Sequence, residues 1–258
     1  MTTFALLPTS VREETFADIT YHIDGELVPA LTVSLTEKDI IYFEQHVLLW
    51  KNTSINIFLH TMRNVTRRIF GGIPIFITNA QGPGEISLSR DGVGHIFAIH
   101  LKTGTSIHVR ENQFLAATSN VEYDFERIRG VSNMLFGGSQ FFIDKFHCLE
   151  GDGVLWLHGY GNVFEKHLED GEQIDIEPRA WLYKSPNLKM ETKIQRLSTI
   201  FFAGGYVVMN RFTGPGRVAL QSMNSSPQTF MQNPLAGIIR FIIFMVIFSI
   251  YLLYVILH

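Results

Sequence analysis

The ten histidines are the residues of this chain most suited to holding a metal ion. They fall mainly in two groups, which are His95, His100 and His108, and then His147, His158 and His167 beside the single cysteine, Cys148. A cupin-like metal site would use a close His-x-His pair, a downstream glutamate and a further histidine, and the chain contains no His-x-His. A metal-dependent enzyme on a cupin-like barrel would therefore need three of these imidazoles to converge within about 2 Å of one ion.

Other arrangements that could support catalysis have simpler interpretations. Cys148 and His147 could act as nucleophile and base, but consecutive residues of a strand point to opposite faces. The acidic residues Asp170, Glu172, Asp175 and Glu177 alternate along one segment, which favours a solvated strand surface. Trp156 and Trp181 are expected in the core or at an interface. The chain has no Gly-x-Ser-x-Gly elbow. We predict no catalytic residue, no metal and no cofactor.

A pattern that occurs three times must position these residues. Its copies read RRIFGGIPIFITNAQGPGEISL, NMLFGGSQFFIDKFHCLEGDGVLWL and TIFFAGGYVVMNRFTGPGRVAL, and their glycine pairs begin 66 and 67 residues apart. Each copy joins a glycine pair, an apolar run, a Gly-x-Gly turn and a second apolar run, which indicates one β unit used three times. Strands rather than a helix follow the turns, which argues against a phosphate-binding loop. The predicted structural turn residues are Gly71, Gly72, Gly82, Pro83, Gly84, Gly137, Gly138, Gly151, Gly153, Gly204, Gly205, Gly214, Pro215 and Gly216.

Alternating apolar and polar residues between these copies are typical of half-buried strands. Leu48, Leu115 and Leu182, spaced 67 residues apart, align as equivalent buried positions. The chain is thus predicted to be all-β, a pseudo-threefold repeated sandwich or barrel followed by a C-terminal transmembrane helix. The predicted order is a leader with early strands (1–30), a β domain (31–222) with repeats at about 31–90, 97–161 and 163–222, a linker (223–234) and the transmembrane helix (235–258).

The phrases MLFGGSQFFIDKF, LEDGEQIDIEPRAWLYKS and FFAGGYVVMNRFTGPGRVALQS resemble the altered-inheritance-of-mitochondria protein twenty-four family. The resemblance covers about residues 31–222. It implies a compact β domain, in a fold class named after an RNA-binding attenuation protein. It also implies no established enzymatic activity and, for mitochondrial members, an association with the inner membrane. RNA binding does not follow from a fold, and 21 basic against 24 acidic residues leave no basic field for nucleic acid.

The last part of the chain has the composition of a membrane span. Residues 235–257 contain Arg240 as their only charged residue, and about 20 apolar residues suffice to cross a bilayer. One arginine before the span and none after it favour the β domain on the cytoplasmic side. In a eukaryotic source the membrane would be the mitochondrial inner membrane. The predicted anchor residues are Arg240, Phe241, Phe244, Phe248, Tyr251 and Tyr254.

These features together favour a non-enzymatic, membrane-tethered scaffold or assembly factor. Its expected partners are the lipid bilayer and either further copies of itself or a membrane protein complex, and not nucleic acid. The alternative is a small-ligand or lipid-binding module with a pocket in or between the β repeats.

Overall fold

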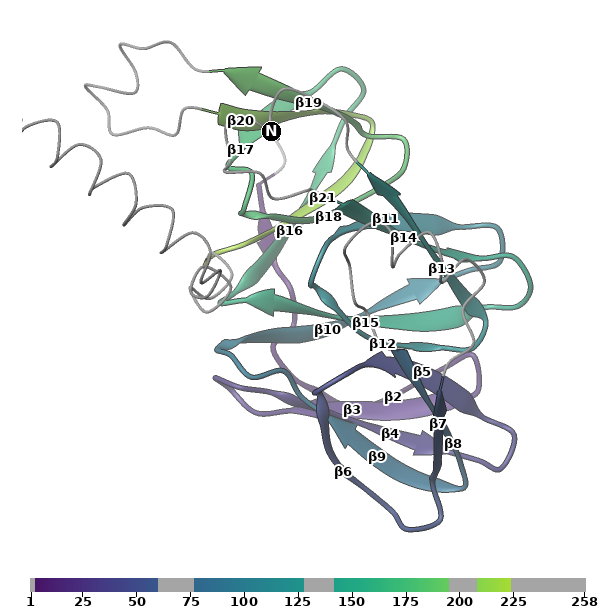
Figure 1. The fold of residues 1–258 in the computed structure, drawn as a ribbon. Coiled ribbons are helices and arrows are strands. Elements are labelled where there is room, and N and C mark those ends of the chain that lie inside the picture. Colours follow the sequence, from purple (N-terminus) through teal and green to yellow (C-terminus); the bar gives the residue numbers. More distant parts are fainter. Residues whose placement is uncertain (1–2, 60–76, 128–141, 195–207, 224–258) are drawn as a thin grey trace, which may run out of the picture. The chain divides into compact units, whose positions relative to one another are not determined.

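The computed structural model describes residues 3–59, 77–127, 142–194 and 208–223 (Figure 1). These residues form antiparallel sheets and contain no helix, so the all-β prediction is confirmed for them. The predicted linker and transmembrane helix, and the three glycine pairs, lie outside the described residues.

Eighteen of the strands fall into three consecutive groups of six. The first group is β4 (Ala30–Leu35), β5 (Ile40–Glu44), β6 (Leu48–Lys51), β7 (Asn56–Leu59), β8 (Ile77–Gln81) and β9 (Gly84–Leu88). The second is β10 (Gly94–Leu101), β11 (Ser106–Arg110), β12 (Phe114–Thr118), β13 (Val121–Arg127), β14 (Phe142–Cys148) and β15 (Gly153–Tyr160). The third is β16 (Val163–Leu168), β17 (Gln173–Ile176), β18 (Trp181–Lys184), β19 (Lys189–Ile194), β20 (Val208–Thr213) and β21 (Gly216–Gln221).

The same antiparallel pairing occurs within each group. The sixth strand lies between the first and the third, as in β4, β9 and β6, in β10, β15 and β12, and in β16, β21 and β18. The fifth lies between the second and the fourth, as in β5, β8 and β7, in β11, β14 and β13, and in β17, β20 and β19. Each repeat therefore contributes two three-stranded pieces to the fold.

Two further pairings join the repeats. Strand β5 of the first group pairs with β12 of the second, and β11 of the second pairs with β18 of the third. The second strand of one repeat thus adds to the third strand of the next, which produces a six-stranded and a seven-stranded sheet. The pieces at the two ends remain in sheets of five and three strands.

Three short strands precede the first repeat. Strands β2 (Val11–Phe16) and β3 (Ile19–Asp24) form a hairpin that extends the sheet beyond β4. Residues Ala17 and Asp18 of its turn have positive φ values of 51° and 63°, the backbone that a two-residue turn between twisted strands requires. Strand β1 (Ala5–Leu6) pairs with β16 instead.

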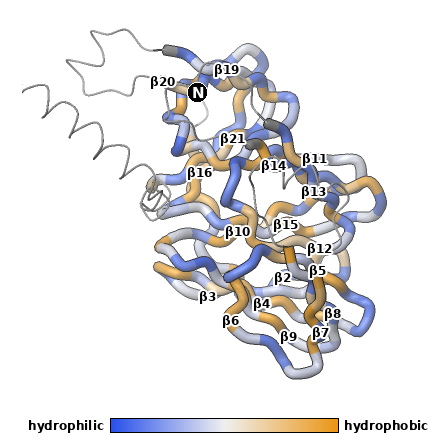
Figure 2. Tube along the Cα trace, viewed as in Figure 1, coloured by the Kyte–Doolittle hydropathy of each residue, from blue (hydrophilic) through white to orange (hydrophobic). Residues whose placement is uncertain are grey.

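Apolar residues that alternate along the strands form the core (Figure 2). Trp156 of β15 is fully buried and packs with Tyr21, their ring centroids 5.3 Å apart. In the third repeat, Trp181 packs with Phe212 at 5.9 Å. Both tryptophans lie in hydrophobic clusters, where aromatic side chains contribute the largest buried areas.

Candidate functional site

The Gly-Pro-Gly turns of repeats one and three share one geometry. A Cβ on Gly82 would overlap the carbonyl oxygen of Thr36, and a Cβ on Gly214 would overlap that of Glu169. Gly84 and Gly216, after the prolines, have φ values of +134° and +142°, which favour glycine. These turns bring the chain against the end of each repeat's first strand, so these glycines are explained by close backbone packing.

The Gly-Asp-Gly turn of repeat two is less crowded by backbone. A Cβ on Gly151 would meet the side-chain amide of Asn120, and one on Gly153 would meet side chains of Thr118, Val121 and Cys148. The carboxylate of Asp152 accepts a hydrogen bond from the backbone N–H of Thr103 at 2.8 Å. The aspartate that replaces proline therefore fastens this turn to a neighbouring one.

The histidines are distributed over several separate environments. His100 accepts or donates a hydrogen bond at 3.0 Å with the Tyr21 hydroxyl and stacks on Phe16 at 4.2 Å. His147 lies 3.4 Å from the Glu122 carboxylate, and His95 contacts the carbonyl oxygen of Pro8. Within the described residues, no group of three or more His, Cys, Asp and Glu side chains is placed to hold a metal ion.

The cysteine is packed inside the sheet. Cys148 has no exposed surface, and its burial raises the pKa of the thiol to about 11. A thiol of raised pKa is a poor nucleophile near neutral pH. Its neighbour His147 is engaged with Glu122 on the adjacent strand, so the pair has separate roles in the structure.

The acidic residues around β17 are paired with nearby cations. Asp175 accepts two hydrogen bonds from Arg211, at 2.7 and 2.8 Å, and these lower the pKa of its carboxyl group. Glu172 lies 2.7 Å from Lys166, and Glu177 accepts hydrogen bonds from Arg179. The carboxylates contribute to ion pairs at the sheet surface.

Buried basic groups face each other where β11 meets β18. Lys184 lies opposite His108 in this pairing, and its ammonium group donates to the carbonyls of Ser185 and Leu188 at 3.3 and 2.9 Å. Burial lowers the pKa of Lys184 to about 8, and burial together with the charges of Lys184 and Lys145 lowers the pKa of His108 to about 4. Satisfied donors of this kind hold a turn in place.

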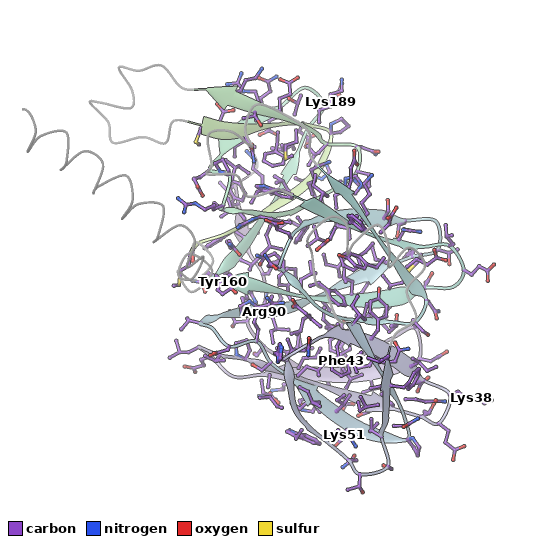
Figure 3. The ribbon with its side chains drawn as sticks, viewed as in Figure 1. Lys38, Phe43, Lys51, Arg90, Tyr160 and Lys189 are labelled. Atoms are coloured by element: carbon purple, nitrogen blue, oxygen red, sulfur yellow. The ribbon has the colours of Figure 1, made fainter. Side chains whose placement is uncertain are left out.

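A second polar group lies between the first two repeats. The guanidinium group of Arg90 donates to the carbonyls of Asn112 and Phe114 and contacts the carboxylate of Glu44. Figure 3 shows Arg90 close to Tyr160. Gln113, within this segment, is fully buried, and among the described residues its side-chain amide has no hydrogen-bond partner.

The largest exposed apolar feature of a strand is β6. Leu48, Leu49 and Trp50 are 41%, 58% and 46% exposed. Their counterparts are Phe114, Leu115 and Ala116 in β12 and Trp181, Leu182 and Tyr183 in β18, and all six are buried. The difference lies in the neighbours, because β5 covers the edge of β12 and β11 covers that of β18.

This comparison corrects the leucine alignment. Leu48, Phe114 and Trp181 begin a β-bulge at the same point of each repeat. The leucine after each of these residues is therefore equivalent, and Leu49, rather than Leu48, aligns with Leu115 and Leu182. A bulge adds one residue to one strand, and a regular 67-residue spacing conceals this shift.

Strand β17 is the second outer strand left by the repeat pattern. It pairs with β20 on one side, and no described strand pairs with its other edge. Its counterparts β5 and β11 each have a strand on both sides. The hydrophobic LLW run was a detectable signal for β6, whereas the sequence of β17 resembles that of its covered counterparts.

The predicted anchor residues, from Arg240 to Tyr254, lie outside the described residues. Within the part of the chain that is described, no helix has the length and apolar character needed to cross a membrane.

Comparison with known proteins adds a family and a fold. A family model described as mitochondrial biogenesis AIM24 matches residues 21–223. The X-ray crystal structure of protein SPYM3_0169 from Streptococcus pyogenes is similar to this chain with a TM-score of 0.62 and 22% sequence identity. The match covers 80% of this chain and 94% of that protein, and at this identity it shows a shared fold. The search of curated proteins finds no match.

Proposed function

This chain belongs to the mitochondrial biogenesis AIM24 family, and on this premise we propose that it is a non-enzymatic scaffold or assembly factor tethered to a membrane. The observation that carries the proposal is the exposed apolar strand β6, with Leu48, Leu49 and Trp50 at the edge of a sheet. An uncovered apolar edge strand favours association with another chain.

The proposed tether is the apolar segment 235–257. Its 23 residues exceed the length of about 20 that a spanning helix needs. Arg240 near its start can reach the lipid headgroups, and Tyr251 and Tyr254 suit the far interface. In this arrangement the β domain faces the side of the membrane on which Arg240 lies, and in a mitochondrion the membrane would be the inner one.

Carbonate extraction of membranes tests the tether with the full chain. We expect the wild-type protein to stay in the membrane pellet and the variant Phe244→Asp/Phe248→Asp to be released, because each central aspartate costs about 2.5–3.5 kcal/mol in insertion. The matched control, Gln228→Asp/Gln232→Asp, adds the same charge in the linker and should stay in the pellet. Release of the wild-type protein would contradict the proposed tether.

A small-ligand or lipid-binding function is the second candidate, and the buried Gln113 favours it. Buried amides are normally hydrogen-bonded, and this one has no partner among the described residues. Native mass spectrometry of the extracted full chain tests the idea. A bound mass that is present in the wild type and absent in Gln113→Leu would support it, whereas a wild type with no adduct would count against it.

A further inference from the structure

We propose that copies of this chain associate head to tail, with β6 of one copy pairing antiparallel with β17 of the next. The inference rests on the proposed scaffold function and names its partner, which is a second copy of the chain. The two strands are the ones that the repeat pattern leaves without a neighbour. Figure 1 shows each of them at the outer edge of its own sheet.

The two junctions inside the chain supply the template. Phe43 of β5 lies opposite Ala116 of β12, and Tyr42 lies opposite Ala117. In the next junction, Val109 of β11 lies opposite Tyr183 of β18, and His108 lies opposite Lys184. The second strand of one repeat therefore meets the third strand of the following repeat twice.

The pairings within each repeat fix which positions correspond. Ile41, Ile107 and Ile174 all lie opposite the equivalent residues Ala80, Phe146 and Phe212. Trp50, Ala116 and Tyr183 all follow the bulge and lie opposite Ser87, Trp156 and Ala219. Phe43 and Val109 therefore correspond to Ile176, and Ala116 and Tyr183 correspond to Trp50. Both internal junctions then have the same register.

This register places Trp50 of one copy opposite Ile176 of the next, and Lys51 opposite Asp175. Aromatic residues paired with β-branched ones and opposite charges in directly facing positions both stabilise antiparallel strands. Lys51 already has the geometry of a junction residue. It donates to the carbonyls of Asn52 and Ile55 at 3.3 and 2.9 Å, as Lys184 does to those of Ser185 and Leu188. Figure 3 shows Lys51 on β6.

The other outer strands are less suited to this pairing. Strand β1 has two residues, β2 carries Arg12, Glu13 and Glu14, and β19 carries Lys189, Glu191 and Lys193. Short or charged edges are those that resist association. Strand β6 instead presents three consecutive large apolar side chains that are buried at both internal junctions. A head-to-tail contact uses two different surfaces, so it generates a closed ring or an open chain of copies.

Cysteine cross-linking of the full-length protein in its membrane tests the register. One tagged copy carries Lys51→Cys and a differently tagged copy carries Asp175→Cys. Facing residues of antiparallel strands have Cα separations of about 4.5–5.5 Å, within the range of a disulfide. Cys148 is fully buried and should not compete. The control combines Trp50→Cys with Asp175→Cys, because a shift of one residue places the side chains on opposite faces.

We expect the 51–175 mixture to form a mixed disulfide dimer at least tenfold more than the 50–175 mixture or either variant alone. Equal or absent cross-linking in the two mixtures would overturn the inference. In a second test, Trp50→Asp should reduce the mass of the detergent-extracted oligomer to that of a smaller species without lowering Tm. An unchanged mass would also overturn it. The proposed function fails separately, through release of the wild-type protein by carbonate.

Discussion

Strands β6 and β18 hold the same position in their repeats but differ in what covers them. Both begin with a bulge, both follow the edge of the sixth strand, and both end with a lysine that donates to two carbonyls of the following turn. Leu182 and Tyr183 of β18 are buried beneath β11, whereas Leu49 and Trp50 of β6 are about half exposed. The comparison shows that burial of this strand comes from the neighbouring repeat rather than from its own.

The largest expected effect separates the covered from the uncovered leucine. Leu182→Ala should lower the free energy of unfolding by about 2–5 kcal/mol, because it leaves a cavity in a packed core. Leu49→Ala removes the same atoms from an exposed position, and it should change the free energy of unfolding by less than about 0.5 kcal/mol. Denaturant unfolding of the two full-length variants, extracted in the same detergent, provides the measurement.

The association state refines this prediction. If copies pair through β6, Leu49→Ala should weaken the oligomer at protein concentrations where Leu182→Ala leaves the folded fraction associated. Equal losses of stability in the two variants, at a concentration where both are monomeric, would show that β6 is covered within its own chain.

The glycine turns allow the repeats to be compared a second time. Gly214→Ala should cost about 1–3 kcal/mol of stability, because the new methyl group would overlap a backbone carbonyl that cannot move aside. At Gly151, where φ is +74°, the neighbouring group is the flexible side chain of Asn120. Gly151→Ala should therefore cost only the conformational penalty, about 1 kcal/mol. Thermal unfolding of both variants would reveal the order, and the reverse order would contradict the close packing of the Gly-Pro-Gly turn.

The sequence was sufficient to predict an all-β chain and its family, because alternation and repeated glycine turns are local features. It misaligned the leucines, since a bulge at Leu48 shifts the strand by one residue without changing the amino-acid pattern. It also could not identify β6 and β17 as outer strands. Equivalent strands have similar sequences whether or not a neighbour is present, so the missing partner is a property of topology. The environment of Gln113 was missed for the same reason, because its burial depends on contacts distant in the sequence.

Acid conditions should weaken the covered junction through His108. Its pKa is lowered to about 4, first by burial and then by Lys184 and Lys145. The unfolded chain therefore binds a proton near pH 6.5 that the folded chain does not bind until about pH 4, and stability falls as the pH falls through this window. His108→Gln should make the decline between pH 6.5 and 4 shallower, as measured by urea unfolding. It should not abolish the decline, because the pKa of His158 is also lowered to about 4. An unchanged slope would show that His108 is protonated alike in both states.

The smallest expected effect is at alkaline pH and comes from Lys184, on the opposite strand of the same junction. Burial lowers its pKa from 10.5 to about 8. Between these values the unfolded chain holds a proton that the folded chain has lost, so Lys184 makes stability rise with pH in this window. The raised pKa of Tyr183 opposes this rise above about pH 10, because the unfolded tyrosine ionises first. Urea unfolding between pH 8 and 9.5 should therefore show the rise in the wild type and lose it in Lys184→Met. The matched variant Lys51→Met, at the equivalent place in the uncovered strand, should keep the rise. Loss of the rise in Lys51→Met alone would assign the buried ammonium group to the wrong repeat and would remove the electrostatic difference between covered and uncovered strands.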